Sequence, residues 1–177
     1  MPRKNIADLL TGGDPRSLGR ADLVAAMVAE NPRLFPELIA GLWSEDPLVR
    51  MRSADAAEKV TRKNPELLRS KKKEMLGLMA EASGPELRWH LALMVSRLKL
   101  NVRERQLAVS LLVEYLKDRS SIVKTFALQG LAELALKSDD DNLRFQVTEI
   151  LRQAVRGGTP AMKSRSRKLL RQMEPVL

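Results

Sequence analysis

Apolar residues recur along this chain at intervals of three and four positions, with polar residues between them. This spacing places apolar side chains on one face of a helix, because an α-helix turns once every 3.6 residues. No run alternates apolar and polar residues with the period of two that is typical of a half-buried strand. Amphipathic helices are therefore predicted for residues Ala21–Glu30, Pro32–Trp43, Pro47–Lys63, Pro65–Ala82, Pro85–Lys99, Val102–Lys117, Ser121–Lys137, Asn142–Val155 and Pro160–Met173.

Short polar connections separate these segments. At several boundaries a proline follows Asn, Asp, Gly or Thr, which suits the first helical position because proline has no N–H to leave unpaired. Residues 118–121 and 138–142 supply polar caps for the helices that follow them. The run Asp139-Asp140-Asp141 is interpreted as such a cap, because Arg144 stands where a calcium-binding loop needs glycine. Connections this short make consecutive helices antiparallel neighbours.

The helices also repeat in pairs. A block that opens with proline or serine and ends with an apolar residue followed by a base recurs roughly every 37 residues, a period typical of an α-solenoid. The four copies are Pro47-Leu48-Val49-Arg50, Pro85-Glu86-Leu87-Arg88, Ser121-Ile122-Val123-Lys124 and Pro160-Ala161-Met162-Lys163. Each pair would bury its apolar face only by stacking on its neighbours.

The first repeat resembles the HEAT family. Its residues 34–43 look like the leucine-rich first helix with its proline, Pro36, and Val49-Arg50 opens a second helix that continues with small residues. In the third repeat Asp118 precedes Val123-Lys124, where the family commonly has an aspartate and a base. The second and fourth repeats depart from this pattern, with Ala82 and Gly157 at the place of the aspartate.

The resemblance implies an all-α fold, a right-handed α–α superhelix of about four helical hairpins plus an N-terminal helix. We expect a single domain. Residues 1–31 would form an N-terminal segment and capping helix, followed by HEAT-like repeats at about 32–64, 65–100, 101–138 and 139–177. The resemblance also implies that the second helix of each hairpin lines a concave docking surface.

Composition narrows the chemistry. The chain has 31 Lys and Arg against 22 Asp and Glu, a net charge of +9, and acids outnumber bases only in residues 1–46. It has no cysteine and one histidine, which excludes disulfides, thiolate-bound zinc, iron–sulfur clusters and multi-histidine metal sites. No apolar run is long enough for a membrane span or a signal peptide. We therefore expect a cytoplasmic protein without metal, cofactor or membrane partner.

One column of residues is expected to face the concave surface. If Val49, Leu87, Val123 and Met162 are buried, the residues three positions further on are predicted to point away from the core. These candidate partner-binding residues are Arg52, His90, Phe126 and Arg165, with Trp89 and Lys168 beside them. They would form a basic groove with an aromatic centre, suited to phosphate contact or stacking. In the alternative interpretation, the two aromatic rings fill gaps between repeats and the imidazole is an ordinary surface group.

A second column places one base in each repeat: Arg50, Arg88, Lys124 and Lys163. The resemblance implies a ladder in which these bases bridge to carboxylates or carbonyls in the turns of adjacent repeats. The alternative is a row of phosphate contacts.

No catalytic constellation stands out, so the leading hypothesis is a non-catalytic scaffold that binds a protein or acidic peptide through the basic concave groove. The alternative is nucleic-acid binding by the same cationic surface. An enzymatic variant of that alternative is suggested by the HEAT-like DNA glycosylases, whose architecture is similar. Their tryptophan and aspartate arrangement has no residue-by-residue match here.

Overall fold

The described part of the chain is entirely helical. The computed structural model describes residues 5–14 and 16–173, and within these residues it contains ten α-helices, four 3-10 helices and no strand. Residues 1–4 of the expected N-terminal segment and 174–177 of the expected last repeat lie outside this description. The chain forms two compact units, residues 1–72 and 73–177.

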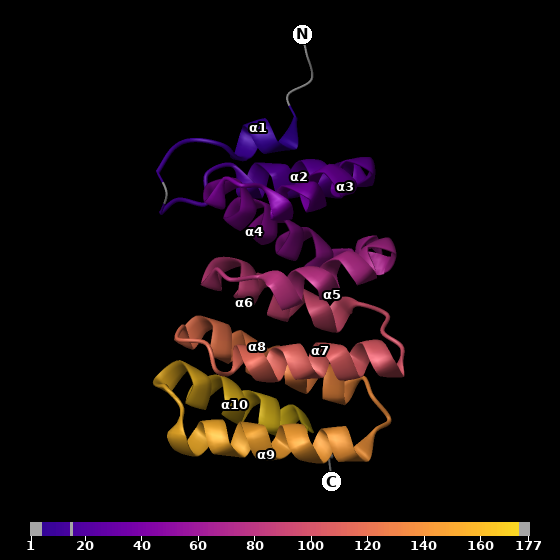
Figure 1. The fold of residues 1–177 in the computed structure, drawn as a ribbon, viewed down its shortest axis with the longest axis vertical. Helices are drawn as coiled ribbons and strands as arrows, with labels where there is room; N and C mark the ends of the chain where they lie inside the picture. Colours follow the sequence, from indigo (N-terminus) through magenta and orange to yellow (C-terminus); the bar gives the residue numbers. More distant parts are fainter. Residues whose placement is uncertain (1–4, 15, 174–177) are drawn as a thin grey trace. The chain divides into compact units, whose positions relative to one another are not determined.

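Unit 1 comprises α1 to α4 and three 3-10 helices (Figure 1). Its elements are α1 (Ile6–Leu10), α2 (Ala21–Glu30), η1 (Pro32–Leu34), α3 (Phe35–Ala40), η2 (Gly41–Trp43), α4 (Pro47–Lys63) and η3 (Pro65–Lys71). The ranges of α2 and α4 match the sequence prediction. The single helix expected for Pro32–Trp43 is instead divided into η1, α3 and η2.

Helix α4 is the centre of unit 1 and packs against α1, α2, α3 and η2. Leu38, Leu42 and Val49 are buried between these elements. Gly41 allows the close approach of η2 to α4, because a Cβ there would lie 3.0 Å from Ser53 Cβ. The absence of a side chain at Gly41 therefore lets η2 pack closely against α4.

Unit 2 contains the remaining helices. They are α5 (Lys72–Glu81), α6 (Pro85–Met94), η4 (Val95–Arg97), α7 (Val102–Tyr115), α8 (Ser121–Leu136), α9 (Asp141–Gly157) and α10 (Pro160–Met173). The range of α10 matches the sequence prediction, and those of α7, α8 and α9 differ from it by one or two residues at their ends. The single helix expected for Pro65–Ala82 is instead divided into η3 and α5, and the one expected for Pro85–Lys99 into α6 and η4. The caps are also confirmed: Ser120 and Asp140 accept hydrogen bonds from the backbone N–H groups of Val123 and Leu143.

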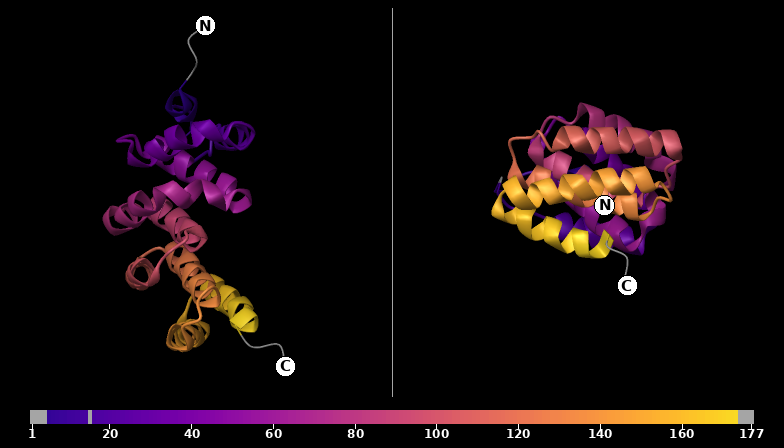
Figure 2. Two further views of the ribbon diagram at one scale, coloured as in Figure 1. Left: turned by 90° about the vertical axis from the view of Figure 1, so that its right-hand side faces the viewer. Right: turned by 90° about the horizontal axis from the view of Figure 1, so that it is seen from below.

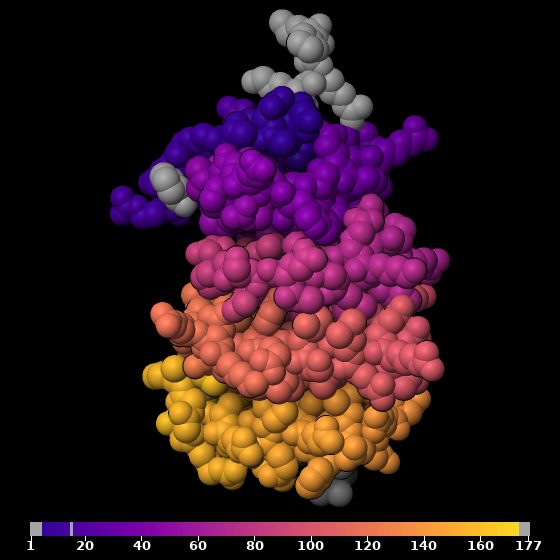
Figure 3. Space-filling model, in the orientation of Figure 1, coloured from indigo at the N-terminus to yellow at the C-terminus, as the bar shows by residue number. Residues whose placement is uncertain are grey.

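Helix α8 is the centre of unit 2. It packs against α6, α7, α9 and α10, and α9 packs against α10. Figure 2 shows α7 and α9 on one side of this unit and α8 and α10 on the other. The space-filling view shows the side that α7 and α9 cover, where their side chains close the spaces between the ribbons (Figure 3). On the other side of the unit, α8 packs against both α6 and α10.

Candidate binding face on α6, α8 and α10

The three neighbouring helices α6, α8 and α10 present a row of partly exposed side chains, which we call the three-helix face. It consists of Trp89 on α6, Phe126, Gln129 and Glu133 on α8, and Arg165 and Lys168 on α10. Between α6 and α8 the backbones approach closely at Gly130, where a Cβ would lie 2.6 Å from the Ala92 carbonyl oxygen. This close packing brings side chains from separate helices into contact.

An aromatic cluster forms one half of the face. The Trp89 and Phe126 rings are stacked, with centroids 5.3 Å apart and planes inclined by 29°. The imidazole of His90 also stacks on the Trp89 indole, with ring centroids 3.3 Å apart. Trp89 and Phe126 are neither fully buried nor fully exposed, so each ring contributes to packing and also offers apolar surface to solvent.

A guanidinium adjoins this cluster. Arg165 Cζ lies 5.5 Å from the centre of the Phe126 ring, within the range of a cation–π contact. Arg165 Nη1 also donates a 2.6 Å hydrogen bond to Gln129 Oε1. Two independent contacts therefore set the orientation of the guanidinium.

A chain of hydrogen bonds supports that orientation from behind. Gln129 Nε2 donates to Glu133 Oε1 at 2.8 Å, so the amide must turn its oxygen toward Arg165. Ser96 Oγ donates to the other oxygen of Glu133. Ser96 lies in η4, directly after α6. This chain of hydrogen bonds, which we call the Ser96–Glu133–Gln129–Arg165 relay, therefore links the end of α6 through α8 to α10.

Positive charge dominates the α10 side of the face. Helix α10 carries five bases and no acid: Lys163, Arg165, Arg167, Lys168 and Arg171. Among the described residues, none of these five forms an ion pair, whereas Lys59 and Arg62 of α4 are paired with carboxylates. Within residues 5–14 and 16–173, no carboxylate is therefore paired with these bases, and their positive potential extends into the solvent.

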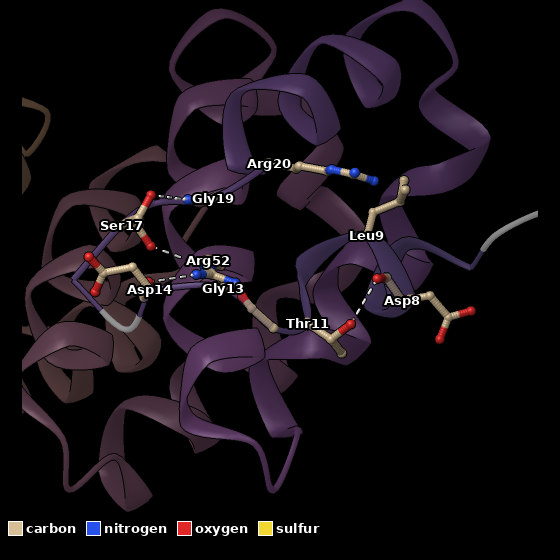
Figure 4. A pocket seen from close by; sticks show the side chains of 10 residues that line it. Asp8, Leu9, Thr11, Gly13, Asp14, Ser17, Gly19, Arg20 and Arg52 are labelled. Atoms are coloured by element: carbon tan, nitrogen blue, oxygen red, sulfur yellow. Dashed lines mark hydrogen bonds between the residues drawn. The ribbon is translucent and has the colours of Figure 1, made fainter.

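The structure corrects the prediction for Arg52. This residue lies in unit 1 and is 1% exposed, so it does not belong to an exposed basic groove together with Arg165. Its guanidinium donates to the carbonyl oxygens of Leu10, Gly12, Asp14 and Ser17 at 2.6–3.1 Å. Figure 4 shows Arg52 beside Asp14 and Ser17. A loop thus wraps around the cation.

The loop around Arg52 depends on glycine. Gly12, Gly13 and Gly19 all have positive φ, and a Cβ on Gly19 would lie 2.8 Å from Arg52 Cζ. A cavity of about 410 Å³ opens beside this loop (Figure 4). Four of the five N–H donors of Arg52 are already bonded to carbonyls, so the residue serves the local fold.

His90 is also corrected. It is 1% exposed, and its Nδ1 lies 2.6 Å from the Glu86 carbonyl oxygen. The reason is geometric: a residue three positions after a buried one is only about 60° away around the helix, and so lies on nearly the same face. On α6 the outward position is Trp89, one residue earlier. Phe126 and Arg165 remain partly exposed at the edge of their helices, and Lys168 is exposed.

The column of bases makes different contacts in different repeats. Arg50 donates to the carbonyls of Ser44 and Glu45 in the preceding turn. Arg88 donates to the Ala82 carbonyl and forms a 2.6 Å ion pair with Asp118 in the next turn. The Arg88 side chain thus joins two successive turns, whereas Arg50 bonds only within its own turn. Lys124 and Lys163 are partly exposed at corresponding helix starts.

The carboxyl of Asp118 is held in its charged form. Burial by itself raises its pKa, but hydrogen bonds from the Ser120 backbone N–H and Arg88, with the charges of Arg88 and Lys124, lower the pKa below its ordinary value. A surface cavity of about 640 Å³ lies at these turns, lined by Arg88, Lys117 and Arg119 among others. The carboxylate of Asp118 already supplies a negative charge beside these bases.

Sequence reasoning missed the relay behind Arg165. The spacing of Gln129 and Glu133 by four residues is a signal that they share one face of a helix. Nothing in the sequence pairs Ser96 with Glu133 or Gln129 with Arg165, because these contacts join residues 36 and 37 positions apart.

A metal site and a membrane-spanning helix are both absent from the described residues. Within residues 5–14 and 16–173, no group of three or more His, Cys, Asp or Glu side chains is placed to hold a metal ion. In the same part of the chain, no helix has the length and apolar character needed to cross a membrane.

Comparison with known proteins gave no match, either to a family model or to a curated protein sequence.

Proposed function

We propose that this protein is a non-catalytic binding protein that docks an acidic segment of a protein partner on the three-helix face. One observation carries the proposal: two partly exposed aromatic rings adjoin a guanidinium whose orientation is set by hydrogen bonding. Aromatic and arginine side chains are enriched among residues that dominate binding energy at interfaces. The unpaired cations of α10 select for a partner of opposite charge.

We also propose that the helix pairs belong to a HEAT-like array wound as a right-handed superhelix. The succession of α6, α8 and α10 as neighbours in unit 2 supports this arrangement. The Arg88–Asp118 ion pair supports it too, because it joins the turns of two successive pairs as the resemblance implies. In such an array the three-helix face would belong to the concave surface.

Nucleic-acid binding is the second candidate, and the five unpaired bases of α10 favour it. A phosphate backbone could neutralise them without sequence readout. Against it, the bases of the face lie on α10 alone, whereas α6 and α8 contribute two rings and an amide, so the cations do not form the extended row that a phosphate backbone would follow. We therefore rank an acidic protein segment first.

The test uses Trp89 as its own reporter. In the Trp43→Phe background Trp89 is the only tryptophan, since the chain has two. A glutamate-rich peptide without tryptophan is titrated while Trp89 emission is recorded. We expect Arg165→Glu with Lys168→Glu to weaken binding about tenfold or more, because hydrogen bonds to charged groups contribute about 1.5–3 kcal/mol each.

The control variant, Arg103→Glu with Arg156→Glu, makes the same change in net charge at exposed positions on α7 and α9, on the other side of unit 2. Equal loss in both variants would show that only net charge matters and would contradict the proposal. A labelled DNA duplex titrated in parallel separates the two candidates. Tight duplex binding near physiological salt, with no peptide binding, would favour nucleic acid.

A further inference from the structure

We propose that the acidic segment is recognised by a two-part motif, in which a carboxylate side chain lies two residues from an aromatic one. The aromatic side chain would stack on Trp89 and Phe126, and the carboxylate would bind Arg165. This inference rests on the proposed function and names the chemistry of its partner. It goes further than the proposed function, because a segment that is merely acidic would need only the cations of α10 and would make no use of the Trp89 and Phe126 rings.

The rings provide the first part of the motif. Trp89 and Phe126 are stacked at 5.3 Å and both keep part of their surface exposed. A third ring that packs on the exposed part of such a pair, offset-stacked or edge to face, removes apolar area from water. A segment without an aromatic or large apolar residue would leave this surface wet.

Arg165 provides the second part. Its guanidinium has five N–H donors, and one hydrogen bond, to Gln129, is found for it among the described residues. The remaining donors can bind a carboxylate in the two-point geometry that suits a planar guanidinium. Because Gln129 and Phe126 already orient the group, binding costs less side-chain entropy than it would for a free arginine.

The spacing follows from the distances. The centre of the Phe126 ring lies 5.3 Å from that of Trp89 and 5.5 Å from Arg165 Cζ. In an extended peptide, side chains two residues apart point the same way and are about 7 Å apart, whereas adjacent side chains point to opposite sides. A pair separated by one residue can therefore reach the rings and the guanidinium together.

Gln129 has the role of a positioning residue. Its amide is held by Glu133, which in turn accepts a hydrogen bond from Ser96, and its oxygen receives Arg165 Nη1. We expect Gln129→Leu to keep the positive charge of Arg165 but to remove the hydrogen bond that fixes the orientation of its guanidinium. The two-point contact with a carboxylate would weaken while general attraction to acidic peptides remained.

The experiment compares four glutamate-rich peptides with the full-length Trp43→Phe protein by Trp89 fluorescence. The reference peptide contains Phe-Ser-Glu. The others replace this phenylalanine by serine, replace this glutamate by glutamine, or place the phenylalanine and glutamate next to each other. We expect each change to weaken binding about tenfold, which corresponds to about 1.4 kcal/mol of binding free energy.

Variants of the protein locate the effect. With Arg165→Gln or Gln129→Leu, we expect the protein to lose its preference for Phe-Ser-Glu over Phe-Ser-Gln and to keep its preference for phenylalanine over serine. Phe126→Leu should reduce the second preference and retain the first. Unchanged circular dichroism and melting temperature serve as the folding control, and Arg156→Gln on α9 serves as the control for charge.

The outcomes separate the two proposals. If all four peptides bind equally and binding still requires Arg165 and Lys168, the motif is wrong and the proposed function stands. If Gln129→Leu keeps full preference for the glutamate, the positioning role is wrong. If no peptide binds or changes Trp89 emission, the proposed function itself fails.

Discussion

At the scale of single residues, the environment of a charge decides its role. Arg52 and Arg165 were expected to act together, yet one is enclosed by backbone carbonyls in unit 1 and the other lies on the three-helix face of unit 2. The sequence shows both as a base at a corresponding helical position. Only the loop that folds over Arg52 makes the difference.

The first prediction concerns Arg52. Arg52→Gln should lower the free energy of unfolding by about 2–4 kcal/mol, because four buried or partly buried carbonyls lose charged donors. Urea denaturation measures the change. Arg50→Gln is the matched control, since Arg50 bonds only to carbonyls of its own preceding turn and is less buried. Equal effects at both positions would contradict the structural role of Arg52.

The second prediction concerns Asp118. Its pKa is lower in the folded protein than the ordinary pKa of an aspartate side chain. Such a group stabilises the fold above its unfolded pKa, and this contribution is lost as the pH falls through the lowered folded pKa. We expect melting temperatures measured between about pH 6 and pH 3 to fall less steeply for Asp118→Asn than for wild type. Parallel curves for the two proteins would refute the assignment.

At the scale of elements, the hydrophobic pattern was a reliable guide. The predicted ranges for α2, α4 and α10 agree with the structure, and the caps at Ser120 and Asp140 form as expected. These features depend on contacts within a few residues, which sequence spacing reports directly. The phase of each helix was less certain, and an error of about 60° placed His90 on the surface when it is buried.

Close packing of α6 and α8 gives the third prediction. Gly130→Ala should destabilise the protein although alanine favours helices by about 1 kcal/mol, because its Cβ would lie 2.6 Å from the Ala92 carbonyl oxygen. Gly77→Ala is the matched control in α5, where no atom lies within 4 Å of the added Cβ. It should raise the melting temperature. A stabilising Gly130→Ala would show that α6 and α8 are not in close contact.

At the scale of the whole molecule, charge is the clearest property. The net charge is +9, and α10 holds five bases without an acid. Such a field accelerates encounters with polyanions and is screened by salt. Charge alone does not separate an acidic protein segment from nucleic acid. The aromatic rings and the oriented guanidinium make that distinction testable.

The fourth prediction follows from this field. Stopped-flow recording of Trp89 emission should show the association rate of a glutamate-rich peptide falling as salt rises from about 50 to 300 mM, because the Debye length shrinks. The dissociation rate should change much less. A matched glutamine-rich peptide is the control, and its association should not depend on salt. Equal salt dependence of both peptides would argue against electrostatic attraction to α10.

The sequence by itself determined the helices, their caps, the repeat of about 37 residues and the basic character, because each of these depends on local spacing or on composition. It also singled out Trp89, Phe126, Arg165 and Lys168. The tertiary structure decided which of the candidates face solvent and which neighbours orient them. Burial of Arg52, stacking of the rings and the relay through Gln129 all depend on contacts between residues 35 or more positions apart. Such contacts leave no trace in local periodicity.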